Sequence, residues 1–169
     1  MDSTSLATEV PVAGSPVIAR GPGDGLTVEA PVGVMTFKAR AEQTHGTLTA
    51  IESVIPPGKG PPLHVHRSED EFIYVLEGRL GFRLEDALRE APAGAFVFIP
   101  RGSAHTWQAI GDAPARFLFG FTPAAEGMER FFERASELPA ATRGPEAFRR
   151  FGADAGMDVL GPPLAEPAP

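Results

Sequence analysis

The chain has 169 residues, no cysteine and a formal net charge of −7 at pH 7. This length is typical of one domain that buries its own core, and the lack of cysteine excludes disulfides, thiolate metal sites and cysteine nucleophiles. The negative charge argues against nucleic acid or a membrane surface as a partner. No apolar run approaches the ~20 residues that span a bilayer, and the N-terminus lacks the basic start and apolar core of a signal peptide. We therefore expect a cytoplasmic protein.

Residues 1–25 mix proline, glycine and small polar residues, which predicts a flexible N-terminal arm. Residues 26–123 predict a β-domain, because short runs rich in Val, Ile, Phe and Thr are bounded by Gly, Pro or Asp. The expected strands cover residues 26–30, 33–41, 46–55, 71–78, 79–85, 96–100, 105–110 and 115–122. Short strands at this spacing favour an all-β sandwich or barrel over alternating strands and helices.

The hydrophobic period changes after Pro123. An apolar residue recurs at every third or fourth position within 124–138, at Met128, Phe131, Phe132 and Ala135, and this spacing predicts an amphipathic helix. A second short helix is predicted over 146–151, with Pro145 at its start. We therefore expect a C-terminal helical segment over residues 124–160 and a loose tail over 161–169. The first helix is expected to be a packing or dimer element, although Phe131 and Phe132 could instead cap the mouth of the barrel.

Three of the four histidines fall in two spaced patterns. The first pattern is Gly58, His64, His66, Glu71 and Gly78, and the second is Gly94, Pro100, Gly102 and His105. Residues two apart on a strand point to the same face, so His64 and His66 can enter one interior. Glu71 follows a short turn and can return beside them in an antiparallel hairpin, whereas only tertiary closure can bring His105 near. Three imidazoles and one carboxylate predict one divalent metal with open coordination positions, which suits catalysis.

Three alternatives to this metal site remain open at this point. The histidines could be exposed, or could be hydrogen-bonded core residues that bind no metal. Glu69 or Asp70 could replace Glu71 as a ligand, although the spacing and the strand parity favour Glu71. His45 lies in a polar turn and is expected to be exposed, with substrate binding or proton transfer as its alternative role.

The patterns G-x5-H-x-H-x4-E-x6-G and G-x5-P-x-G-x2-H resemble the two signature motifs of the cupin superfamily, over about residues 45–122. The resemblance implies a single-domain cupin, whose fold is a double-stranded β-helix or jelly-roll barrel, here with C-terminal helices packed on it. It also implies that His64, His66, Glu71 and His105 ligate the metal. In one departure, Ala109 stands where the second motif usually ends in Asn. That Asn is not a ligand, so the change concerns strand packing.

Twelve phenylalanines and few polar candidates for the interior predict an apolar pocket, which suits an aromatic or hydrophobic ligand. The candidate lining residues are Phe37, Ile51, Ile73, Phe82, Phe98, Trp107 and Phe119. Trp107 shares a strand face with His105, so it either lines the cavity or packs in the core. Tyr74 is opposite in parity to Glu71 and is expected to face away from the metal.

Similarity to quercetin dioxygenase-like cupins implies a dioxygenase-type oxidoreductase that acts on a phenolic or enolic small molecule. Fe, Mn or Ni is the expected metal, with Zn, Co or Cu as further options. Glu71 would also be the base that removes the substrate hydroxyl proton. The alternatives are a cupin isomerase, cyclase or lyase that uses the metal as a Lewis acid, and a non-enzymatic cupin that binds small molecules. By analogy with other cupins we expect a homodimer.

Overall fold

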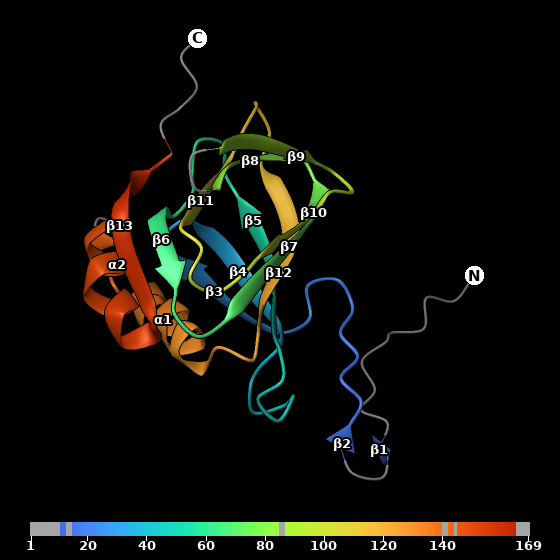
Figure 1. Cartoon of the computed structure of the whole chain (residues 1–169). Helices are drawn as coiled ribbons and strands as arrows, with labels where there is room; N and C mark the ends of the chain where they lie inside the picture. Colours follow the sequence, from blue (N-terminus) through green and yellow to red (C-terminus); the bar gives the residue numbers. More distant parts are fainter. Residues whose placement is uncertain (1–10, 13–14, 85–86, 140–141, 144, 165–169) are drawn as a thin grey trace.

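Two antiparallel β-sheets face one another across an apolar interior, and two helices pack at one end of them (Figure 1). The computed structural model describes residues 11–12, 15–84, 87–139, 142–143 and 145–164. This architecture is the predicted jelly-roll barrel with C-terminal helices. Residues 1–10 and 13–14 of the expected N-terminal arm and residues 165–169 of the expected tail lie outside the described residues.

The larger sheet has six strands in the order β10-β7-β12-β5-β4-β3. Their bounds are β3 Leu26–Ala30, β4 Gly33–Ala39, β5 Thr49–Ile55, β7 Asp70–Glu77, β10 Phe96–Ile99 and β12 Ala115–Thr122. The smaller sheet has five strands in the order β13-β6-β11-β8-β9. Their bounds are β6 Pro62–His66, β8 Arg79–Leu84, β9 Ala87–Pro92, β11 His105–Ala109 and β13 Met157–Pro163. A separate short pair joins β1 (Pro11–Val12) to β2 (Ser15–Pro16).

The two-residue period of the strands determines which side chains enter the barrel. In β7, Glu71, Ile73 and Val75 are buried, whereas Tyr74 is 42% exposed, as its parity predicted. In β6, His64 and His66 are buried on the same inward face. In β11 even the outward Thr106 is buried, because a loop covers this strand. The Thr106 hydroxyl donates to the carbonyl oxygen of Pro61 in that loop at 2.7 Å. The strand pattern therefore points both histidines of β6 inward.

The C-terminal segment differs from the expectation in one respect. Helices α1 (Glu126–Ser136) and α2 (Pro145–Gly152) form as predicted, and α1 buries its predicted apolar face. A short 3₁₀ helix (Ala153–Ala155) then leads into β13, which the sequence interpretation had divided between helix and tail. β13 forms because it pairs along the edge of β6, with Met157 opposite His66 and Val159 opposite His64. The C-terminus is therefore part of the barrel beside the histidines.

Helix α1 is anchored to the larger sheet by a buried carboxylate, Glu129, that sequence analysis did not single out. Glu129 accepts hydrogen bonds from the backbone N–H of Ala41 at 2.8 Å, the hydroxyl of Thr49 at 2.6 Å and Nε of Arg40 at 3.1 Å. The Thr49 hydroxyl in turn accepts from the N–H of Ala125, directly before the helix. A buried charge is tolerated only when it is paired and hydrogen-bonded in this way.

Neither α1 nor α2 is long and apolar enough to cross a membrane, and the same holds for every other helix in the described part of the chain.

Candidate metal centre

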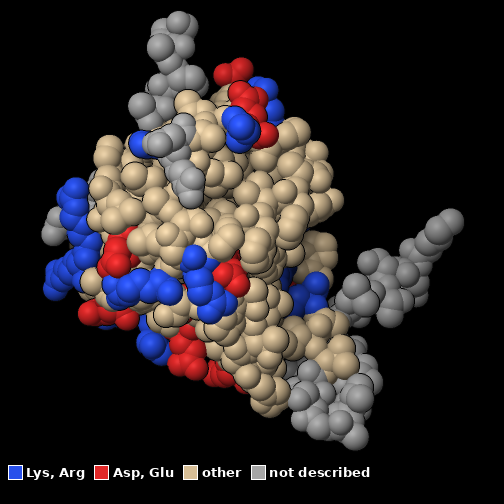
Figure 2. All heavy atoms as spheres, viewed as in Figure 1, with Lys and Arg blue, Asp and Glu red and all other residues tan. Residues whose placement is uncertain are grey.

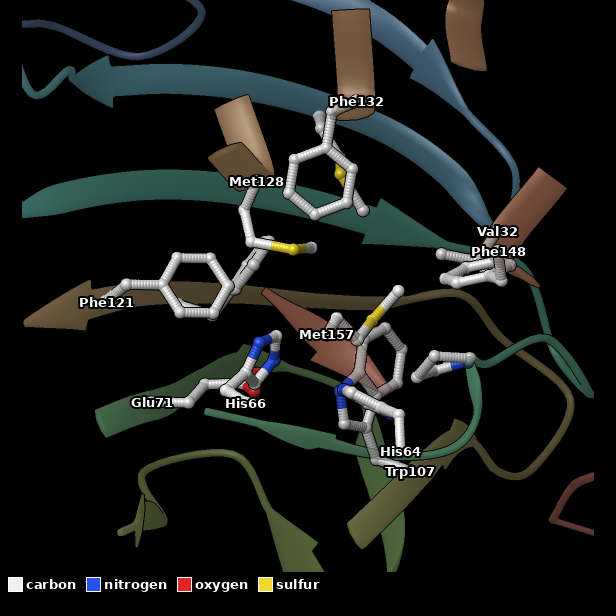
Figure 3. Close-up of a pocket in the computed structure, with 13 residues that line it drawn as sticks. Val32, His64, His66, Glu71, Trp107, Phe121, Met128, Phe132, Phe148 and Met157 are labelled. Carbon is white, nitrogen blue, oxygen red and sulfur yellow. The ribbon is translucent and has the colours of Figure 1, made fainter. Parts of the chain in front are cut away.

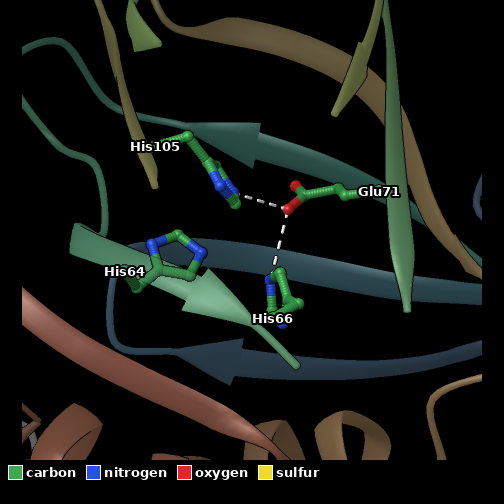
Figure 4. Close-up of side chains that lie close together, drawn as sticks. All are labelled: His64, His66, Glu71 and His105. Carbon is green, nitrogen blue, oxygen red and sulfur yellow. Dashed lines mark hydrogen bonds and ion pairs between the residues drawn. The ribbon is translucent and has the colours of Figure 1, made fainter. Parts of the chain in front are cut away.

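The four predicted ligands meet in the interior of the barrel, and they come from both sheets (Figure 4). His64 and His66 lie on β6, and β11 pairs with β6 so that His105 stands directly opposite His64. Glu71 lies on β7, which belongs to the opposite sheet. The predicted hairpin between the histidine strand and Glu71 is therefore wrong. The chain crosses from one sheet to the other after His66, so the carboxylate faces the imidazoles across the barrel.

The donor atoms of these four side chains all lie within 4.8 Å of one another. Each side chain is almost fully buried, with at most 3% of its surface exposed. Oε2 of Glu71 accepts a hydrogen bond from Nε2 of His105 at 3.0 Å and lies 3.3 Å from Nε2 of His66. One carboxylate oxygen is thus shared by two imidazoles from the facing sheet.

Backbone carbonyl groups orient two of the imidazoles. Nδ1 of His64 donates to the carbonyl oxygen of Pro62 at 2.8 Å, and Nδ1 of His105 donates to that of Ser103 at 3.0 Å. In His64 a proton held on Nδ1 leaves Nε2 as the nitrogen available to a metal, whereas His105 donates through both nitrogens and would have to release its Nε2 proton to bind one. Nδ1 of His66 is buried and has no hydrogen-bond partner among the described residues.

The charges of the cluster depend on its burial and its mutual contacts. Burial, together with the positive charges of His105 and His66, lowers the pKa of His64 to about 3, so this imidazole is neutral at pH 7. Burial alone raises the pKa of Glu71, but the hydrogen bonds from His105 and His66 outweigh it and hold that pKa well below its usual range. Burial lowers the pKa of His105, and the contact with Glu71 more than offsets this, so the pKa is raised. The carboxylate is therefore ionised, as a metal ligand must be.

The cluster fits one divalent metal ion. Three imidazoles and a carboxylate are nitrogen and oxygen donors that first-row transition metals accept, and their donor atoms converge within the span of one ion. A metal would also satisfy nitrogens that are costly to bury without partners. The exposed form of the first alternative is excluded, because all three imidazoles are buried in one group.

The rival ligands lie elsewhere. Asp70 binds Arg101, with Oδ1 3.0 Å from Nε and Oδ2 2.9 Å from Nη2, and these contacts lower its pKa to about 2. Glu69 is only partly buried and lies outside the cluster. His45 is exposed, has a left-handed backbone φ of 52° and is also outside the cluster. Glu71 is thus the carboxylate that the fold delivers to the histidines.

A narrow cavity of about 30 Å³ lies against His64, His66 and Glu71 (Figure 3). Of the predicted pocket residues, Trp107 and Phe119 line it. The other predicted residues do not line this cavity: Phe37, Ile51, Ile73 and Phe82 are buried in the core, and Phe98 is 52% exposed.

Phe98 is the clear error among these predictions. It stands opposite Phe72 in the β10–β7 pair, whereas the inward Glu71 stands opposite Ile99. Paired residues of neighbouring strands share a face, so Phe98 must point out of the barrel.

The C-terminal segment supplies the remaining side of the cavity. Met128 and Phe132 from α1 lie opposite His66 and Glu71, and Phe148 from α2 and Met157 from β13 complete this side (Figure 3). We call these four residues the cap. The sequence interpretation allowed Phe132 a capping role but missed the other three. Their apolar periodicity shows that they are buried and carries no information about what they cover.

Comparison with known proteins agrees with the fold. Residues 51–121 match the family model of the cupin domain. These residues form a cupin domain. This domain model ends just before α1, so Met128, Phe132, Phe148 and Met157 lie outside the matched region.

Relatives of this cupin differ in the activities that their names state. The polyketide synthase CurC of Streptomyces cyaneus is 33% identical over 73 residues, which cover 43% of this chain and 47% of CurC. The structure of KdgF from Halomonas sp. superposes with a TM-score of 0.54 at 22% identity, covering 63% of this chain and 92% of KdgF. A predicted oxalate decarboxylase from Thermotoga maritima superposes with a TM-score of 0.51 at 25% identity, covering 53% of this chain and 79% of that protein. This cupin spans about half the length of the curated relatives that it matches.

Proposed function

We propose that this cupin is a metal-dependent enzyme that acts on a phenolic or enolic small molecule, with dioxygenation as the first candidate reaction. The observation that carries the proposal is one buried, ionised carboxylate among three imidazoles at the end of an apolar cavity. His64, His66, Glu71 and His105 would hold the metal, with Fe, Mn or Ni as first candidates. When bound, a redox-active divalent metal favours the deprotonated form of a substrate oxygen and couples the substrate electronically to O₂.

Glu71 is the candidate general base. A base must be ionised at working pH and must lie within hydrogen-bond reach of the proton that it removes. Glu71 is ionised because His105 and His66 hydrogen-bond to it, and it lines the cavity beside the histidines. A phenolic or enolic hydroxyl placed at this end of the cavity would lie beside the carboxylate. Because the hydrogen bonds from His105 and His66 lower the pKa of Glu71, proton transfer would also require the bound metal to lower the pKa of that hydroxyl.

The cavity lining favours the apolar part of such a substrate. Besides the ligands, its described lining includes the aromatic residues Trp107, Phe119 and Phe121 and the cap, and it includes no Lys or Arg that would bind a phosphate or a second carboxylate. A volume of about 30 Å³ holds only one or two water molecules. An aromatic substrate therefore requires the cap to move outward on binding.

The similarity to a polyketide synthase protein favours a second candidate reaction. Polyketide intermediates carry repeated carbonyl groups that enolise, and a metal with a carboxylate base can promote their cyclisation or isomerisation without O₂. The same residues, His64, His66, Glu71 and His105, would serve this reaction. Dioxygenation and cyclisation thus share the deprotonation and differ in their need for O₂.

Turnover with and without oxygen tests the proposal. The metal-loaded protein is incubated with flavonols and with aromatic polyketides that bear enolic hydroxyl groups, while O₂ consumption and product mass are followed. We expect substrate-dependent O₂ uptake that a His66→Ala variant lacks. Equal turnover in anaerobic buffer would transfer the assignment to the cyclase, isomerase or lyase class. Tight binding of metal and ligand without turnover of any candidate would instead indicate a non-enzymatic binding protein.

Replacing Glu71 with glutamine tests its role as a base. The amide keeps an oxygen donor but cannot accept the proton, so we expect turnover to fall by roughly 10²–10⁴-fold, while bound metal falls much less. Metal content by elemental analysis and turnover are measured on the same sample. Glu69→Gln is the matched control, because this neighbouring carboxylate lies outside the cluster. Parallel loss of metal and turnover would reduce Glu71 to a ligand only.

A further inference from the structure

Methionine side chains form part of the cavity wall beside the metal centre. Of the four methionines in the chain, Met35, Met128 and Met157 line this cavity, from β4, α1 and β13. Each of the three is at most 2% exposed, whereas the outward sides of α1 and α2 carry charged side chains of both signs (Figure 2). In the view of Figure 3, Met128 lies above His66 and Met157 lies above His64. We call Met35, Met128 and Met157 the thioether wall.

The thioether wall is more adaptable than the aromatic residues beside it. The rings of Phe119 and Phe121 meet edge to face with their centroids 5.9 Å apart, and those of Phe119 and Phe132 do so at 6.2 Å. Such ring pairs prefer a particular geometry, whereas a methionine has three rotatable side-chain bonds and adapts its shape to its neighbours. A ligand that enters the cavity therefore displaces the thioether groups more readily than the rings.

The backbone that carries the thioether wall is fastened to the barrel near Met157 and near Met128. The N–H of Arg67, directly after β6, donates to the carbonyl oxygen of Gly156 at 3.0 Å, and the guanidinium group of Arg67 pairs with Asp158. Helix α1, which carries Met128, is fixed by the buried carboxylate described above. The wall therefore yields by rotation of its side chains, while the helix and the strand stay in place.

Gly152, the last residue of α2, leaves space for the end of the Met157 side chain. A Cβ atom on Gly152 would lie 2.6 Å from the methyl carbon Cε of Met157. The backbone of Gly152 has an ordinary helical φ of −64°, so the contact needs the missing side chain and not an unusual conformation. The methyl group of Met157 thus lies between the cavity and the end of α2.

We propose that the thioether wall determines the size of the apolar part of the substrate that the cavity accepts. This inference rests on the proposed function, which supplies the phenolic or enolic class of ligand. A ligand whose hydroxyl lies beside Glu71 must place its apolar part against Met128 and Met157, because these side chains line the cavity next to the histidines. A larger apolar part requires these two side chains to rotate further away, so their length sets the limit. Met128 and Met157 are thus specificity-determining residues.

Binding of para-alkylphenols, from methyl to hexyl, to the metal-loaded protein tests the proposal. Trp107 is the one tryptophan of the chain and lines the cavity, so its fluorescence reports binding at this place. In Met157→Ala we expect the affinity for the hexyl compound, relative to the methyl compound, to rise by at least about 10-fold, because one methylene in an apolar pocket already has an effect of this order. Met128→Ala should shift the preference in the same direction.

Gly152→Ala should shift the preference the opposite way, toward the shorter alkyl chains. The new methyl group displaces Cε of Met157, and the cavity is the free space beside it, because protein interiors are otherwise close-packed. Alanine is favoured in a helix, so this variant keeps the test valid even if Met157→Ala does not fold. Leu80→Ala is the matched control, since it shortens a fully buried side chain that does not line this cavity.

The outcomes are distinct. Opposite shifts in Met157→Ala and Gly152→Ala, with the wild-type preference kept in Leu80→Ala, support the proposal. An unchanged preference in the folded variants of Met157 and Gly152 overturns it. So does an equal shift in Leu80→Ala, or a failure of every alkylphenol to bind. Shifts as expected in a protein that turns over no candidate substrate would contradict the proposed enzymatic function alone.

Discussion

Replacing His66 or His105 with alanine is expected to remove most of the bound metal and to leave the barrel folded. Changes to groups that only orient metal ligands typically lower metal affinity 10- to 100-fold, so loss of a ligand itself should lower it by more than about 100-fold. His66 lies on β6 and His105 on β11. Nε2 of His66 lies 3.3 Å from Oε2 of Glu71, and Nε2 of His105 lies 3.0 Å from the same oxygen. Either change therefore removes one donor and disturbs the carboxylate. The apolar core remains, because neither histidine belongs to the cluster of buried apolar side chains that forms it.

Elemental analysis of protein purified without chelators or added metal measures this effect. His45→Ala is the matched control: it removes the one histidine outside the cluster, which is exposed on a turn. We expect this variant to keep the wild-type metal content. Unchanged metal in both His66→Ala and His105→Ala would show that the assigned site is wrong. Circular dichroism on the same samples confirms that the sheets persist.

Replacing Glu129 with alanine is expected to lower the free energy of unfolding by about 3 kcal/mol, because removing one member of a buried charged network leaves its partners unsatisfied. The variant leaves the N–H of Ala41, the hydroxyl of Thr49 and part of the Arg40 guanidinium without their acceptor. Helix α1 then loses its anchor to the larger sheet. Because α1 carries Met128 and Phe132, the cap over the metal centre should loosen as well.

Urea unfolding of the metal-free proteins measures this loss. Glu126→Ala is the control, since Glu126 lies on the same helix but is exposed and pairs with Arg130 in an i,i+4 ion pair worth about 0.3–0.5 kcal/mol. We expect the control to change stability by no more than that amount. Similar losses in both variants would show that Glu129 contributes only helix-surface electrostatics. Glu129→Gln, which keeps one acceptor oxygen, should fall between them.

The local parts of the fold were predictable because they depend on short periods. Two-residue alternation placed His64 and His66 on one inward face and turned Tyr74 outward, and the structure agrees with both. Three- and four-residue spacing identified the buried face of α1. Phe98 was placed wrongly because residues 95–100 are apolar throughout, so the sequence of β10 offers no polar face from which to read its parity. Its register with β7 decides the orientation.

The sequence by itself indicated which four side chains could bind a metal, because His64, His66, Glu71 and His105 stand at the spacings of two short motifs. Only the tertiary structure decided that Glu71 approaches from the sheet opposite His64 and His66. It alone decided that Met157 and Phe148 close the cavity and that Glu129 anchors α1. These contacts join residues far apart in the chain. They depend on strand order and on the packing of layers, which hydrophobic periodicity does not encode.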